Sequence, residues 1–75
     1  MADKKLRFGV VGAGKLGGFH TRTLSNMPEV ELVGVSDPNL LRAQVLAWRY
    51  NCVAYKTVEE LLSQVDALVI AAPTE

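Results

Sequence analysis

The sequence predicts an α/β fold built on a parallel sheet, and three observations support this prediction. Short apolar, β-branched runs alternate with segments of helical periodicity along the 75 residues. A glycine-rich turn, residues 12–17, lies between the first such run and the first helical segment. Residues 67–72 are apolar at every position, which is typical of a strand covered on both faces. Strands alternating with helices at this spacing predict parallel pairing through right-handed crossovers, in the order β-α-β-α-β-α-β.

The first half of the chain supplies two strands and the helix between them. Leu6–Val11 is a short apolar run that ends at Gly12, and Val30–Ser36 is a second β-branched run. Between them, residues 15–26 have apolar side chains at helical spacing, and Pro28 ends the helix. The expected buried stripe of this helix consists of Leu16, Phe19, Thr23 and Met27.

The second half supplies two more helices and two strands. Asn39 is expected to cap a helix whose apolar stripe is Leu41, Val45 and Trp48. Residues 52–55 read as a short third strand, and residues 67–72 as the fourth.

A third, short helix is expected between these two strands. Thr57 and Glu60 have the spacing of a capping box, in which the threonine hydroxyl accepts from the glutamate amide. Leu61 and Leu62 are expected to form the buried side of that helix.

Composition restricts the classes of function. Eight Lys or Arg and eight Asp or Glu give a formal net charge of zero, which does not favour nucleic acid or an anionic membrane as a partner. A chain that is 49% hydrophobic and 21% charged is too apolar for intrinsic disorder. The longest apolar run, residues 67–72, is too short to cross a bilayer. The single cysteine, Cys52, can form neither an internal disulfide nor a cysteine-based zinc site, which indicates a cytoplasmic protein.

The segment Gly12-Ala13-Gly14-Lys15-Leu16-Gly17 matches the Gly-x-Gly-x-x-Gly pattern of dinucleotide-binding turns, in its required place between a strand and a helix. Gly12 permits the tight turn, Gly14 permits close approach of a pyrophosphate, and Gly17 permits close packing of the helix on the strand. Amides at the helix start then face the phosphates. Lys15 and Leu16 are included among the expected cofactor contacts, with Lys15 as a loose phosphate contact or a solvated side chain. The alternative is a tight turn with no ligand.

Asp37, at the end of the second strand and 25 residues after Gly12, is the expected partner of an adenosine ribose. Its carboxylate can accept from both ribose hydroxyls and would repel a 2′-phosphate, so NAD is expected rather than NADP. Arg42, one turn into the next helix, can reach the adenine or a phosphate. The alternative is that Asp37 only caps that helix.

The fourth strand is expected to end beside the first, at the crevice where ligands bind in doubly wound sheets. The small residue Ala72, together with Pro73 and Thr74, would then border the nicotinamide half of the cofactor. An ordinary strand-ending turn is an equal alternative. His20, Cys52, Trp48 and Tyr50 are expected to pack rather than to act as a base, a nucleophile or stacking platforms, and no metal site is expected.

Three segments carry a family resemblance: LRFGVVGAGKLGGFH at residues 6–20, VELVGVSDPN at 30–39 and VDALVIAAPTE at 65–75. Together they resemble the amino-terminal cofactor domain of the Gfo/Idh/MocA (glucose-fructose oxidoreductase / inositol dehydrogenase) family. The resemblance covers nearly the whole chain. It implies a partial Rossmann fold with sheet order 3-2-1-4 and an NAD(P)-dependent oxidoreductase acting on a sugar, cyclitol or nucleotide-sugar hydroxyl. It also implies the glycine, Asp37 and Ala72–Thr74 roles stated above.

Family members are longer, with a Glu-Lys-Pro motif and a substrate domain that these 75 residues lack. Residues 1–75 are therefore expected to be the amino-terminal part of a dinucleotide-binding domain, truncated before its last strands and inactive by itself. The uncharged fourth strand would then be an exposed edge, so a homodimer through residues 67–72, or by exchange of elements, is expected. Two alternatives stay open: a short, non-catalytic nucleotide-binding or self-associating module, and a different dinucleotide-linked enzyme.

Overall fold

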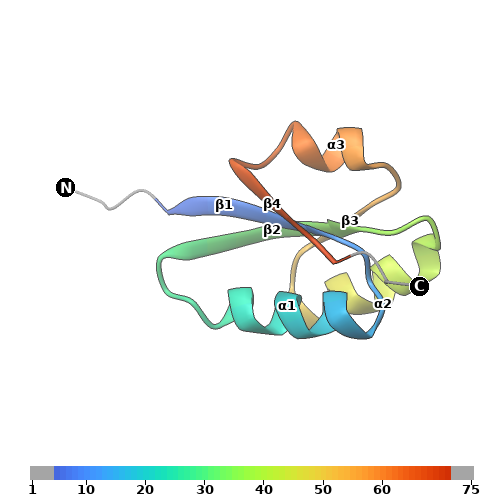
Figure 1. Cartoon of the computed structure of the whole chain (residues 1–75), viewed down its shortest axis with the longest axis horizontal. Helices are drawn as coiled ribbons and strands as arrows, with labels where there is room; N and C mark the ends of the chain where they lie inside the picture. Colours follow the sequence, from blue (N-terminus) through green and yellow to red (C-terminus); the bar gives the residue numbers. More distant parts are fainter. Residues whose placement is uncertain (1–4, 72–75) are drawn as a thin grey trace.

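The computed structural model describes residues 5–71, which form a parallel four-stranded sheet in the order β3-β2-β1-β4. This confirms the predicted α/β class and strand order. Helices α1 and α2 cover one face of the sheet and α3 covers the other (Figure 1). The elements in chain order are β1 (Leu6–Val11), α1 (Lys15–Ser25), β2 (Val30–Ser36), α2 (Leu40–Tyr50), β3 (Val53–Tyr55), α3 (Val58–Leu62) and β4 (Ala67–Ile70).

Strand β1 occupies the centre of the sheet. It pairs with β2 from Leu6 opposite Val30 to Val11 opposite Ser36, with one irregularity between Phe8 and Gly9. On its other side, β1 pairs with β4 from Phe8 opposite Ala67 to Val11 opposite Ile70. Because all pairs are parallel, the carboxyl ends of β1, β2 and β4 lie together at one end of the strands, where α1 begins.

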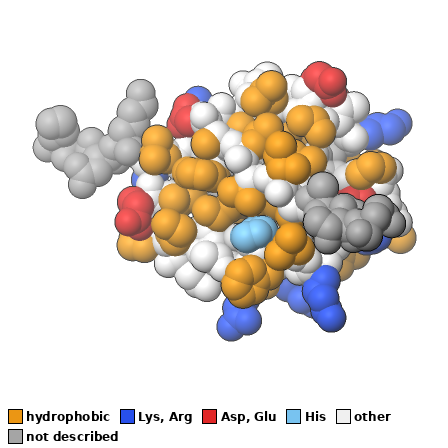
Figure 2. Space-filling model, viewed as in Figure 1, with side chains coloured by type: hydrophobic (Ala, Val, Ile, Leu, Met, Phe, Trp, Pro, Cys, Tyr) orange, Lys and Arg blue, Asp and Glu red, His pale blue; other side chains and the backbone are white. Residues whose placement is uncertain are grey.

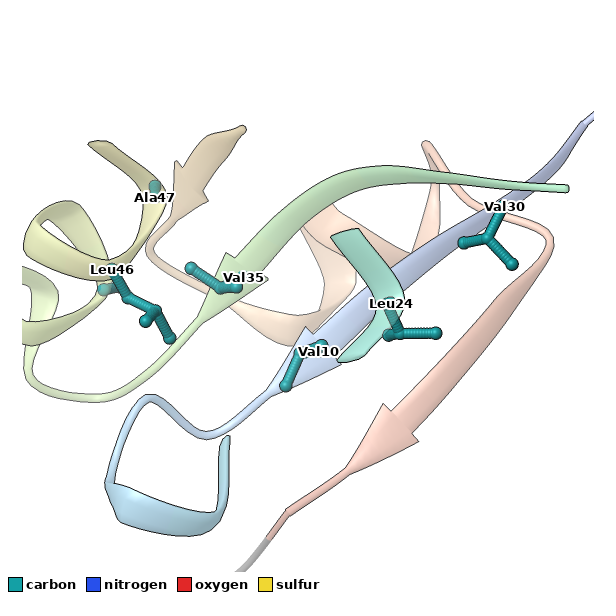
Figure 3. Close-up of a cluster of buried hydrophobic side chains, with 7 residues drawn as sticks. Val10, Leu24, Val30, Val35, Leu46 and Ala47 are labelled. Carbon is teal, nitrogen blue, oxygen red and sulfur yellow. The ribbon is translucent and has the colours of Figure 1, made fainter. Parts of the chain in front are cut away.

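The main core lies between the sheet and the α1–α2 layer. Val10 and Val35 on the central strands are fully buried, and Leu24 and Leu46 reach them from the two helices (Figure 3). Small side chains complete the helix surfaces that face the sheet: Gly17 and Thr21 on α1, and Ala43 and Ala47 on α2. These small residues allow both helices to pack closely against the strands.

The predicted buried stripes of these two helices are wrong. Trp48 is 86% exposed, and Leu41, Val45, Leu16 and Phe19 also lie on the surface. On α1 the stripe is displaced because Gly17 lies against the backbone of Gly12, which turns the small side of the helix toward the sheet. On α2 the alanines face the sheet for the same reason, since small side chains permit the closest approach.

The remaining elements agree with prediction except at their ends and in the exposure of Leu62. The Thr57 Oγ1 accepts from the Glu60 amide at 3.2 Å, so Thr57 caps α3 as predicted. Leu61 is buried as expected, whereas Leu62 is exposed, because a helix of one turn presents only one residue to the sheet. Strand β3 begins at Val53 rather than at 52, after Asn51 ends α2 in the left-handed conformation (φ 58°). Strand β4 ends at Ile70, short of the predicted residue 72.

Candidate dinucleotide site

The turn from β1 into α1 depends on Gly12, which has a φ of +106°. A side chain is strained in that conformation. A Cβ at this position would also lie 2.7 Å from the carbonyl oxygen of Ala71, just after β4. The Gly12 amide donates to the Ser36 carbonyl at 2.7 Å, and the Ala71 amide donates to the Val11 carbonyl at 2.8 Å. Gly12 therefore lies where the carboxyl ends of β1, β2 and β4 converge.

Gly17 holds α1 against this turn. A Cβ on Gly17 would overlap the carbonyl oxygen of Gly12, so no other residue fits without moving the helix. This contact brings the first turn of α1 directly above the end of β1, as expected for the third glycine of the pattern.

The start of α1 differs from those of the other two helices that the structure describes. Asn39 caps α2 by accepting from the Arg42 amide at 3.3 Å, and Thr57 caps α3. The residue at the start of α1 is Gly14, which has no side chain and forms no cap, and no acidic residue lies in the first turn. The amides of Lys15 and Leu16 at that end face outward with the positive end of the helix dipole, which suits an anionic ligand.

Asp37 lies directly beside this turn, and it is only 8% exposed. Its Oδ2 accepts from the Ala13 amide at 2.7 Å and its Oδ1 accepts from the Asn39 amide at 2.8 Å. The carboxylate thus ties the β1–α1 turn to the β2–α2 turn. The cap of α2 is Asn39 and not Asp37. Each carboxylate oxygen has a second lone pair, so Asp37 retains the capacity to accept from a ligand.

The guanidinium of Arg42 lies over Gly14. A Cβ on Gly14 would meet the Arg42 Nη2 at 3.1 Å, so the missing side chain is what admits the cation there. Sequence reasoning singled out both residues but did not predict that they lie together. A groove of about 660 Å³ lies between α1 and α2. The end of this groove at the start of the two helices, called its upper end, is lined by Gly14, Lys15 and Arg42.

Three of the predicted site residues, Ala72, Pro73 and Thr74, lie outside the residues that the structure describes. Ala71, just before them, is buried beside Gly12. Sequence reasoning missed one contact of the site, the Ala13 amide that donates to Asp37. The parallel order of β1 and β2 was the signal, because it brings the residues after both strands together.

The other residues considered for chemistry lie away from this site. The half-buried His20 packs edge-on against the ring of Phe19, with 5.7 Å between ring centroids. Partial burial raises the pKa of the Cys52 thiol to about 11, because a thiolate there would lose solvation, so the thiol is protonated near neutral pH. Tyr50 and Cys52 pack against the core as expected, but Trp48 does not.

No three His, Cys, Asp or Glu side chains of residues 5–71 gather where they could hold a metal ion. No helix in the described range has the length and apolar character needed to span a membrane.

Comparison with known proteins places this geometry in a family. Residues 6–75 match the model of the Gfo/Idh/MocA family, described as an oxidoreductase family with an NAD-binding Rossmann fold. The UDP-N-acetylglucosamine 3-dehydrogenase of Acidithiobacillus ferrooxidans is 41% identical over 69 residues, which are 92% of this chain and 21% of that protein.

Two similar solved structures contain the cofactor. GenD2 from gentamicin A biosynthesis, in complex with NAD, matches with a TM-score of 0.88 at 33% identity, over 93% of this chain and 21% of its own. The myo-inositol dehydrogenase of Lactobacillus casei, in complex with NAD(H) and myo-inositol, matches with a TM-score of 0.82 at 26% identity, over 92% and 22%. The chain therefore spans about a fifth of the length of these relatives. On this evidence the protein belongs to the Gfo/Idh/MocA oxidoreductase family, whose cofactor is NAD, and it corresponds to the amino-terminal part of that family's Rossmann fold.

Proposed function

We propose that this chain binds NAD as the amino-terminal part of the dinucleotide-binding domain of an oxidoreductase. The substrate class is a sugar, cyclitol or nucleotide-sugar hydroxyl. The observation that carries the proposal is the uncapped start of α1, with its glycine turn, beside the carboxylate of Asp37. The dehydrogenases that the chain resembles act on UDP-N-acetylglucosamine and myo-inositol by name, which supports the substrate class.

Each residue of the site has a role in this proposal. The turn formed by Gly12, Gly14 and Gly17 would receive the pyrophosphate, with the amides of Lys15 and Leu16 directed at it. Hydride chemistry belongs to the nicotinamide, and the chain contributes binding and orientation. The segment Ala72, Pro73 and Thr74 would border that nicotinamide.

The adenosine end of the cofactor would lie between Asp37 and Arg42. The free lone pairs of Asp37 suit the two ribose hydroxyls, and its charge disfavours a 2′-phosphate, so NAD binds better than NADP. Arg42, over Gly14, can pair with a phosphate or stack on the adenine.

Asp37→Ala tests the site. We expect the wild-type chain to bind NADH saturably and more tightly than NADPH. Energy transfer from Trp48 to the bound nucleotide measures the binding. The variant should bind NADH at least about 10-fold more weakly, since hydrogen bonds to a charged group contribute roughly 1.5–3 kcal/mol each. The preference for NADH over NADPH should also shrink, because the repulsive charge is gone.

Glu29→Ala is the matched control, because it also removes one carboxylate. Glu29 is exposed in the turn before β2, at the amino-terminal end of that strand and so away from the site. It should leave both affinities unchanged. Binding of neither nucleotide by folded wild-type chain, or equal affinities for Asp37→Ala and wild type, would contradict the proposed site.

Residues 1–75 are proposed to be inactive in hydride transfer by themselves. The support is that the chain covers about a fifth of the length of the dehydrogenases it resembles. Incubation of the chain with NAD and myo-inositol or UDP-N-acetylglucosamine should give no NADH absorbance above that of an Asp37→Ala sample. Substrate-dependent NADH formation that Asp37→Ala abolishes would refute this part of the proposal.

A self-associating module is the second candidate, and the β4 edge favours it. Within the described residues β4 pairs only with β1, carries no charge and leaves Ile70 68% exposed. Figure 2 shows hydrophobic side chains gathered across the face on which β4 lies in front. An apolar edge with free backbone groups is a template for pairing with another strand. A homodimer through β4, or by exchange of elements, is therefore proposed.

Light scattering after size exclusion tests this assembly. At micromolar concentration the wild-type chain should have twice the monomer mass, and Ile70→Lys should be monomeric, because a charge on an edge strand opposes pairing. Val53→Lys, on the exposed β3 edge, is the matched control and should remain dimeric. A monomeric wild-type chain would exclude the assembly.

The proposed cellular location of the protein is the cytoplasm. The support is its single cysteine, Cys52, whose thiol is protonated.

A further inference from the structure

The groove between α1 and α2 extends well beyond the dinucleotide site. Its upper end is at Gly14, and it continues along both helices to Arg22 and Arg49, with a volume of about 660 Å³. Only the upper end has a role in the proposed binding of NAD. The rest of the groove, down to Arg22 and Arg49, has no function in that proposal.

Four cations line the groove in two pairs. Lys15 and Arg42 lie at its upper end, and Arg22 and Arg49 at its lower end. On each helix the two cations are seven residues apart, which is two turns or roughly 10.5 Å. No acidic residue lines the groove, and none of the four cations forms an ion pair within residues 5–71.

The surface between the two charged levels is apolar. Phe19 on α1 is 62% exposed, and Val45 on α2 is more than half exposed. Leu46 and Gly18 lie deeper between them, where a Cβ on Gly18 would be 3.9 Å from the Leu46 Cδ1. Large apolar side chains exposed side by side and rimmed by charge mark an interaction site. These are the same side chains whose helical spacing suggested burial, so their pattern suits a partner rather than the sheet.

We propose that this groove docks an amphipathic helix of a partner protein that carries carboxylates two turns apart, with apolar residues between them. A helix laid along the groove would present residues i and i+7 to the two charged levels and its i+3 and i+4 side chains to Phe19 and Val45. Charge complementarity selects an acidic segment. The apolar middle and the zero net charge of the chain disfavour nucleic acid as the occupant.

The probe is a labelled 18-residue peptide of Ala, Leu and Gln with two Glu residues seven apart on its apolar face. Fluorescence anisotropy with the 75-residue chain should show saturable binding. A twin with Gln in place of both Glu residues should bind at least about 10-fold more weakly, and added salt should weaken only the Glu peptide.

The paired reversal Arg22→Glu and Arg49→Glu should weaken the Glu peptide at least about 10-fold. The pair Lys5→Glu and Lys56→Glu, which makes the same change in net charge at two exposed positions outside the groove, should not. Both variants keep Lys15, Arg42 and Asp37, so NADH binding is measured in the same samples. Loss of peptide binding with NADH binding intact separates this inference from the proposed cofactor site. If the paired reversal unfolds the chain, Val45→Glu at an exposed position replaces it.

Amide signals of the ¹⁵N-labelled chain locate the peptide. Shifts should concentrate at Gly18, Phe19 and Val45 as the Glu peptide is added. Equal binding of the Gln twin, indifference to the paired reversal, or shifts elsewhere would overturn the proposal. So would concentration-dependent shifts of these residues without peptide, which would assign the groove to a second copy. Tighter binding of a 20-base-pair DNA duplex with the same loss on reversal would assign it to nucleic acid.

Discussion

Gly17→Ala should destabilise the chain by about 3 kcal/mol and abolish NADH binding. The new methyl group would overlap the Gly12 carbonyl oxygen, a backbone atom that no rotamer change can move aside. Overpacking typically costs about 1–3 kcal/mol, and the upper value applies here because α1 itself must shift. A chain of this length has on the order of 4–11 kcal/mol of total stability, so the transition should move far to lower denaturant. Urea unfolding followed by circular dichroism measures the change.

Gly18→Ala is the matched control, one residue further along the same helix. Its Cβ would lie 3.9 Å from the Leu46 Cδ1, which is ordinary van der Waals contact. Alanine is favoured over glycine inside a helix by about 0.8–1 kcal/mol, so this variant should unfold at higher urea than the wild type. Equal midpoints for the two variants would show that α1 is not held against Gly12 as the structure indicates.

Leu61→Ala should destabilise the chain by about 2–5 kcal/mol, the usual range for removing a leucine from a core. Leu61 is fully buried and is the largest fully buried side chain in the described residues. It lies over Gly9 of β1, where a Cβ would be only 2.6 Å from the Leu61 Cδ1. It is the one buried residue of α3, so its loss removes the side chain through which α3 packs on the sheet. Thermal unfolding followed by circular dichroism should show a clear fall in Tm.

Leu62→Ala provides the comparison, because Leu62 follows Leu61 in the same helix and is 54% exposed. The substitution removes the same atoms but opens no cavity, so its effect should be within about 0.5 kcal/mol. If both variants lost the same stability, α3 would be packing through a different side from the one described.

Local sequence was sufficient to predict the elements of this protein and their parallel pairing, whereas the strand order 3-2-1-4 was implied by the family resemblance. Strand runs are apolar and β-branched, and their alternation with helices admits few topologies under the right-handed crossover rule. The Thr57 cap and the glycine turn were also predictable from local sequence. The Thr57 cap joins two residues that are three apart, and the glycine pattern lies within residues 12–17, so one stretch of sequence contains each signal.

Tertiary packing decided which sides of the helices are buried. Hydrophobic periodicity located apolar stripes on α1 and α2 but could not tell whether they face the sheet. The small residues Gly17, Ala43 and Ala47 take that position, because close approach of helix to strand excludes large side chains. The placement of Arg42 over Gly14 and the hydrogen bond from Ala13 to Asp37 depend on the same approach. Sequence alone thus determined the elements and the residue types of the site. The tertiary structure determined their contacts, because those join residues that are distant in the chain.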